Sequence, residues 1–158
     1  MQVREVMNPN AEACGPADNL STAAGIMWRH NCGVVPVVDE GQRVTGVITD
    51  RDICMAVATR GRLAAQIAVA EVQSGRVFTC SPDDDVRAAL RVMEENQVRR
   101  LPVVAGGAAL VGVLSLHDVV RRTTPTRGRG GGGVSYEDVM GVLKALCEPA
   151  AETVGAAY

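Results

Sequence analysis

Two pairs of residues in the sequence combine a hydroxyl with a carboxylate at the same spacing. Thr49 lies three residues before Asp52, and Ser115 lies three residues before Asp118. A hydroxyl at the end of a strand caps the helix that follows, and a helix N-terminus attracts anions. A carboxylate one turn into that helix can accept hydrogen bonds from both hydroxyls of a ribose, by analogy with dinucleotide-binding folds. The spacing therefore indicates two sites for a ribose-containing ligand.

A simpler interpretation of these pairs is purely structural. Thr49 and Ser115 would then be helix caps only, and Asp52 and Asp118 would only complement the helix dipole. For a single pair this interpretation would be preferred. The same spacing occurs twice, each time after a Gly and two apolar residues, and this recurrence favours a binding site.

The two pairs belong to an internal repeat. When the sequence is shifted by 66 residues, residues 3–53 align with residues 69–119 without a gap, and 15 of 51 positions are identical. Unrelated sequences match at roughly one position in sixteen. A duplication of this length predicts two copies of one supersecondary unit that bury their faces against each other.

Each copy predicts the element order β-α-β-β-α, which makes the fold class α+β. Asp18 and Asp84 are the predicted N-caps of the first helix in each copy. Short β-branched runs bounded by turn residues indicate buried strands, and Glu40-Gly41 and Gly106-Gly107 tolerate a tight hairpin. The predicted strands are residues 11–14, 34–38 and 44–48 in the first copy, and 77–80, 101–104 and 110–114 in the second. The closing helices are expected to start near residues 50 and 116.

The remaining segments complete the predicted domain organisation. Repeat 1 covers residues 1–61, a connector 62–68 and repeat 2 residues 69–122. A Gly/Arg-rich linker at 123–134, a C-terminal helix at 135–148 and a tail at 149–158 follow. In the helix, Ser135 and Asp138 form a capping-box-like pair. Its apolar stripe is expected to dock on the chain's own core, and it consists of Val139, Val142, Leu143 and Leu146.

The ordered set of these motifs resembles the CBS domain, named after cystathionine β-synthase. The matching segments are residues 3–7, 35–39 and 46–52 in the first copy, and 101–104 and 112–118 in the second. The resemblance covers about residues 2–122. It implies a pseudo-two-fold pair of tandem repeats with two clefts that bind adenosine-type ligands such as AMP, ADP, ATP, NAD or S-adenosylmethionine. It also implies a homodimer.

The resemblance assigns ligand-binding residues to the two clefts. In this family a cleft takes its hydroxyl–acid end from one repeat and its adenine-lining strand from the other. The first cleft would join Thr49, Arg51 and Asp52 to Val98, Arg99 and Arg100. The second would join Ser115, His117 and Asp118 to Cys32, Gly33 and Val34. Guanidinium groups pair well with phosphates, so the first cleft is expected to bind the more anionic ligand. A solvated charged face is the alternative role of these arginines.

Composition limits the other functions. The net charge of −2 and the 3% aromatic content argue against nucleic acid, although Arg121, Arg122, Arg127 and Arg129 leave an RNA-binding alternative. No apolar run predicts a signal peptide or membrane span. Five widely spaced cysteines and two histidines predict neither a zinc site nor a disulfide framework, but free thiols in the cytoplasm. With no nucleophile–base constellation, the expected function is a non-enzymatic sensor that needs no cofactor and signals to a protein partner. The alternative is a structural dimer with empty clefts.

Overall fold

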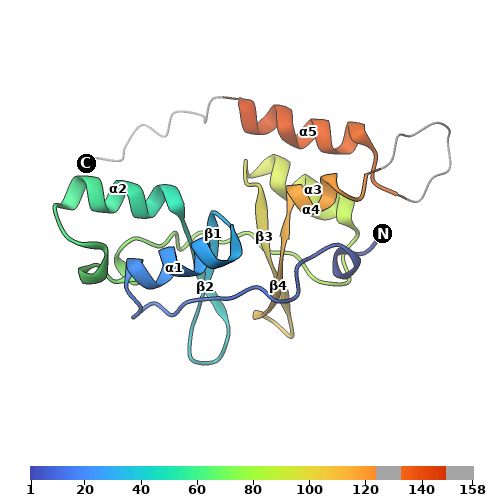
Figure 1. Ribbon diagram of the computed structural model, residues 1–158. Coiled ribbons are helices and arrows are strands. Elements are labelled where there is room, and N and C mark those ends of the chain that lie inside the picture. The colour runs from blue at the N-terminus through green and yellow to red at the C-terminus, as the bar shows by residue number, and fades with distance from the viewer. Residues whose placement is uncertain (124–132, 149–158) are drawn as a thin grey trace.

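The computed structural model describes residues 1–123 and 133–148, and Figure 1 shows two similar halves with the last helix lying over the second half. The predicted tail and all of the predicted linker except residues 123, 133 and 134 lie outside the described residues. The first half contains α1 (Leu20–His30), β1 (Val34–Val38), β2 (Val44–Thr49) and α2 (Asp50–Arg60). The second contains α3 (Val86–Glu95), β3 (Arg100–Ala105), β4 (Ala109–Ser115) and α4 (Leu116–Val120), and α5 (Tyr136–Cys147) follows. Short 3-10 helices span Val3–Glu5, Ala64–Gln66 and Val69–Glu71.

The strands form two antiparallel hairpins, β1–β2 and β3–β4, which confirms the two predicted central strands of each copy. The predicted opening strands are wrong in extent. Each is reduced to a single parallel bridge, Cys14 to Val37 and Cys80 to Val103. The next ladder bond would need an N–H from Pro36 or Pro102, which proline lacks. The prolines therefore stop the opening strand after one residue.

The first helix of each copy begins one residue later than predicted. Asn19 and Asp85 are the N-caps, and they accept hydrogen bonds from the backbone N–H groups of Thr22 and Arg87. Asp18 and Asp84 instead accept from the N–H groups of Gly15 and Ser81, both at 2.7 Å. These two carboxylates close the turn that precedes the helix, so they are not available as caps.

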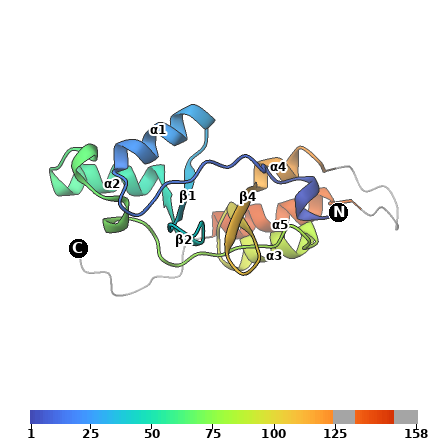
Figure 2. The ribbon, with the colours of Figure 1, turned by 90° about the horizontal axis from the view of Figure 1, so that it is seen from below.

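The opening segments of the two repeats are exchanged between the halves. Val3 and Val6 lie in the core of the second half with Val86 and Leu101, whereas Val69 lies in the core of the first. The backbone bonds repeat at both crossings: Val3 N–H donates to Asp84 O at 2.9 Å, and Val69 N–H donates to Asp18 O at 2.7 Å. Figure 2 shows the N-terminal segment starting beside the second half and crossing to α1. The halves are therefore interlocked by their first residues.

Helix α5 docks on α3, as its apolar stripe predicted. Val139 and Val142 are buried in the second core, and Leu146 packs against it. Leu143 is 39% exposed and lies outside this core, so its place in the docking stripe is wrong. The capping pair is confirmed, since Asp138 Oδ2 accepts from Ser135 N–H at 2.8 Å.

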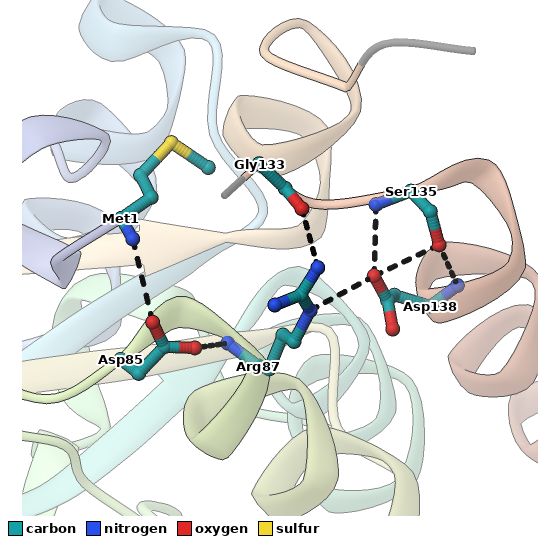
Figure 3. Close-up of polar contacts among 6 residues, drawn as sticks. All are labelled: Met1, Asp85, Arg87, Gly133, Ser135 and Asp138. Carbon is teal, nitrogen blue, oxygen red and sulfur yellow. Dashed lines mark hydrogen bonds and ion pairs between the residues drawn. The ribbon is translucent and has the colours of Figure 1, made fainter. Parts of the chain in front are cut away.

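Arg87 ties α3 to this cap. Its Nε lies 3.3 Å from Asp138 Oδ2, and its guanidinium also donates to Gly133 O (Figure 3). At the other end of α5, Gln97 Nε2 donates to Ala145 O at 2.9 Å.

Among the described residues, no helix combines the length and apolar character needed to cross a bilayer.

Candidate ligand-binding cavities

The two hydroxyl–acid pairs have the same geometry in both halves. Thr49 is the N-cap of α2, and its hydroxyl donates to Asp52 Oδ2 at 2.6 Å while it accepts from Asp52 N–H at 3.2 Å. Ser115 caps α4 and makes the same pair of bonds with Asp118. In each pair the bonds within the described residues use Oδ2 of the carboxylate. Oδ1 of each carboxylate therefore makes no hydrogen bond within the described residues.

Cavity 1, with a volume of about 860 Å³, lies where the strand end of the first repeat meets β3 of the second. Of the residues predicted for the first cleft, all but one line it: Thr49, Arg51, Val98, Arg99 and Arg100. Asp52 does not line the cavity. It makes the same capping bonds as Asp118, which does line cavity 2, so this prediction is wrong for the first cleft although the local geometry is shared.

Cavity 2, with a volume of about 530 Å³, is the counterpart formed by the strand end of the second repeat. Ser115, His117 and Asp118 line it together with Cys32 and Val34 of the first repeat. The structure places Gly33, predicted for this cleft, in cavity 1. Gly33 O accepts from Asp50 N–H at 3.3 Å, so this residue faces the start of α2 in its own repeat.

The two cavities differ in charge. Four arginines line cavity 1 with a single carboxylate, that of Asp50; they are Arg51, Arg76, Arg99 and Arg100. Cavity 2 has Arg100, two carboxylates and both histidines of the chain. One of these carboxylates, Glu12, lies 2.7 Å from His30 Nε2, and this hydrogen bond, with help from Arg29, lowers the pKa of Glu12. Cavity 1 is therefore the more cationic site.

Several residues that line the two cavities were not predicted from the sequence. Trp28, Arg76, Phe78 and Gln97 line cavity 1, and the guanidinium of Arg76 lies 5.0 Å from the centre of the Phe78 ring. Asn8, Asn10, Glu12 and His30 line cavity 2. The repeat alignment held a usable signal, because Arg76 and Phe78 align with Asn10 and Glu12. These positions correspond in the two copies and precede the first helix of each, so they could have been predicted to line equivalent walls of the two cavities.

Two interlocked α+β repeats that share two cavities define a ligand-binding repeat pair. A profile of the CBS domain matches residues 3–59 and 69–124, and the chain belongs to this family. The CBS domain-containing protein YhcV of Bacillus subtilis is 34% identical over 117 residues, which cover 74% of this chain and 81% of that protein. Hypoxic response protein 1 of Mycobacterium tuberculosis is 28% identical over 148 residues, which cover 94% and 95% of the two chains.

Solved structures have the same fold. A crystal structure of Hypoxic Response Protein I with two coordinated zinc ions superimposes with a TM-score of 0.70 and 30% identity, over 77% of this chain and 98% of that one. The CBS domain pair of protein MJ0100, in complex with 5'-methylthioadenosine and S-adenosylmethionine, superimposes with a TM-score of 0.69 and 25% identity. The match covers 77% of this chain and 94% of that one. The described part of our chain has no group of three or more His, Cys, Asp or Glu residues placed to hold a metal ion.

Proposed function

We propose that this protein is a regulatory sensor that binds adenosine-type ligands in cavities 1 and 2 and passes the bound state to a protein partner. One observation carries the proposal: each cavity joins the hydroxyl of one repeat to strand residues of the other. Thr49 lies with Arg100 of β3 in cavity 1, and Ser115 lies with Val34 of β1 in cavity 2. The MJ0100 pair, with its two adenosyl ligands, supports this ligand class.

Different residues of the two cavities bind different parts of the ligand. Asp118 accepts hydrogen bonds from the ribose in cavity 2 through Oδ1. In cavity 1 the ribose contacts the Thr49 hydroxyl, which is hydrogen-bonded to Asp52, and Arg51 and Arg99 bind phosphate oxygens. Both volumes fall in the range of about 300–1,000 Å³ common for small-molecule sites.

Signalling requires that the ligand bind one conformation of the protein better than another. Because each cavity has walls from both repeats, a ligand fixes one half relative to the other. The proposed function is ligand binding and signalling without a catalytic step, in line with the CBS family to which the chain belongs. A homodimer in the cytoplasm, in contact with the regulated partner, completes the proposal.

A thermal-shift panel tests this function. AMP, ADP, ATP, NAD+ and S-adenosylmethionine are added to the wild type and to Asp52→Ala, Asp118→Ala and, as a control, Glu40→Ala, an exposed turn residue outside both cavities. A ligand at a hundred times its dissociation constant stabilises the fold by about 2.7 kcal/mol. At least one ligand should raise the melting temperature of the wild type and the control, but raise it less in an aspartate variant.

The comparison uses the ligand-induced shift, because both aspartates also cap helices and their loss lowers the melting temperature without ligand. If no adenosyl ligand shifts the wild type, the protein is a structural dimer with empty clefts. If stabilisation survives both substitutions in full, the assignment of the aspartates is wrong.

A further inference from the structure

Cavity 1 extends beyond the cleft between the repeats into a groove between α1 and α2. The groove residues are Ala24, Met27, Trp28, Ile53 and Cys54. In the repeat alignment their counterparts are Leu90, Met93, Glu94, Val119 and Val120. Leu90, Met93 and Val119 are buried in one core with Val139 and Val142 of α5. The same groove therefore exists in both halves, but α5 fills it only in the second.

The open groove exposes an aromatic ring that the fold does not use. Trp28 is the only tryptophan in the chain and is 89% exposed. Its counterpart Glu94 has the polarity of an ordinary surface residue and lies beside Gly141 of α5. A large apolar side chain left in water at the edge of a cavity indicates a surface that a ligand or partner covers.

The charges of cavity 1 indicate what kind of ligand extends into the groove. Arg51 lies in the first turn of α2, between Thr49 in the cleft and Ile53 in the groove, so a phosphate bound by Arg51 lies at the junction of the two compartments. Arg99 lines the same cavity. A ligand that has phosphates at this junction and a ribose at Thr49 can place a further group on Trp28, and bases stack on aromatic side chains.

We propose that the groove between α1 and α2 is a second compartment of cavity 1, which holds the second aromatic ring of a dinucleotide stacked on Trp28. This inference rests on the proposed function and names the ligand class for one of its two sites. Cavity 2 has no such compartment, since the groove of its half is filled by α5, and it takes a ligand with one nucleoside. The larger volume of cavity 1, about 860 Å³ against about 530 Å³ for cavity 2, agrees with this assignment of ligands.

The test compares ligands that differ only in the second ring. ADP-ribose is diadenosine diphosphate without its second adenine, and it is also NAD+ without its nicotinamide. Binding of all three, and of AMP, is measured by isothermal titration calorimetry on the full chain. Trp28→Ala removes the ring and Trp28→Phe keeps one. Leu63→Ala is the matched control, because Leu63 is 68% exposed and lines neither cavity.

In the wild type, diadenosine diphosphate should bind at least about fivefold more tightly than ADP-ribose, the smallest gain expected from one stacked base. Trp28→Ala should abolish this preference without weakening AMP or ADP-ribose, and Trp28→Phe should retain part of it. The Leu63 variant should match the wild type.

Equal affinities of the three ADP-ribose-containing ligands for the wild type would overturn the inference but leave the proposed function standing. Failure of AMP and of all three to bind would remove the proposed function as well. Trp28 fluorescence gives an independent check. Emission that is already blue-shifted without ligand, and that shifts red on dilution, would mean that a second copy of the chain covers Trp28, and the compartment would not exist.

Discussion

A single carboxylate can both complete a helix cap and, as we propose, bind a ligand. Asp118 closes the cap of α4 through Oδ2, its Oδ1 makes no hydrogen bond within the described residues, and the residue lines cavity 2. A structural and a functional interpretation of the hydroxyl–acid pair are therefore compatible, because a carboxylate has two oxygens and a cap needs one. The cap also holds the side chain in one orientation, which reduces the entropy lost when a ribose binds.

Asp118→Asn separates the two functions. The amide oxygen still accepts from the Ser115 N–H, but the charge-assisted bonds to the ribose are lost, at a cost of about 1.5–3 kcal/mol. We expect AMP titrated by calorimetry to fill two sites in the wild type and one in the variant, while the melting temperature without ligand falls less than in Asp118→Ala. Two unchanged sites in the variant would contradict this assignment.

Burial controls the reactivity of the cysteines. Burial raises the pKa of the Cys14 thiol to about 11 and that of Cys80 to about 12. Only the thiolate reacts with iodoacetamide. At about pH 8 we expect Cys54 and Cys147, which are exposed, to be alkylated much faster than Cys14 and Cys80, as followed by peptide mass spectrometry. Equal rates for all four would indicate that the cores open readily.

At the scale of elements, the glycine of each hydroxyl–acid motif is explained by a crossing segment. A Cβ on Gly112 would lie 2.6 Å from Asn8 O, and a Cβ on Gly46 would lie 2.8 Å from the Gln73 side chain and 3.0 Å from Ser74 O. Asn8 N–H donates to Val113 O, and Ser74 N–H donates to Val47 O, both at 2.9 Å. The opening segment of the first repeat thus runs directly over β4, and that of the second repeat runs directly over β2.

Gly112→Ala should therefore destabilise the fold by about 1–3 kcal/mol, because the added methyl meets backbone that cannot move without breaking the Asn8–Val113 pairing. Urea denaturation measures the loss. Gly75→Ala is the control, since nothing lies within 4 Å of a Cβ at that position and its φ is not positive. Equal stability of the two variants would mean that the crossing segment adjusts freely.

The cap of α5 makes its docking sensitive to acid. Backbone donation from Ser135, with further help from the Ser135 hydroxyl and Arg87, lowers the pKa of Asp138 below its usual 3.8. A carboxylate with a lowered pKa stabilises the fold above its unfolded pKa, and this contribution is lost as pH falls below 3.8 through the folded value. Ser135→Ala should cost about 1 kcal/mol near neutral pH.

Asp138→Asn should remove the part of the acid destabilisation that this carboxylate causes. Urea midpoints at about pH 7 and about pH 3 provide the measurement. The difference between the two should be smaller in Asp138→Asn than in the wild type, and an identical difference would show that the Arg87–Asp138 contact does not support α5.

At the scale of the whole molecule, the exchanged openings couple the two halves. Val3 is fully buried in the second core and Val69 is fully buried in the first. Val3→Ala and Val69→Ala should each cost about 1–3 kcal/mol, by the usual loss of buried methyl groups. Hydrogen exchange should increase first in α3 for Val3→Ala and first in α1 for Val69→Ala. If each variant loosens its own repeat instead, the exchange of segments is wrong.

Local patterns were enough to predict most of the elements and the hydroxyl–acid pairs at the starts of α2 and α4. The 66-residue repeat, the β-branched runs and the Ser135–Asp138 cap depend on neighbours in the sequence, and the structure contains the elements they predict. The predictions were wrong where a residue or element distant in the sequence determines the structure. The short opening strands depend on Pro36 and Pro102, which precede their bridge partners Val37 and Val103. The exposure of Leu143 depends on which face of α5 meets α3.

The sequence by itself determined that two similar units exist and that each carries a hydroxyl and an acid at a helix start, because these features lie within one stretch of chain. Only the tertiary structure decided which opening segment completes which core, since Val3 and Val69 are identical residues in equivalent contexts and the pattern is unchanged if they are exchanged. It also decided that α5 fills one groove and leaves the other open beside Trp28. A single helix can cover only one of two equivalent surfaces, and this breaks the symmetry that the repeat alone would predict.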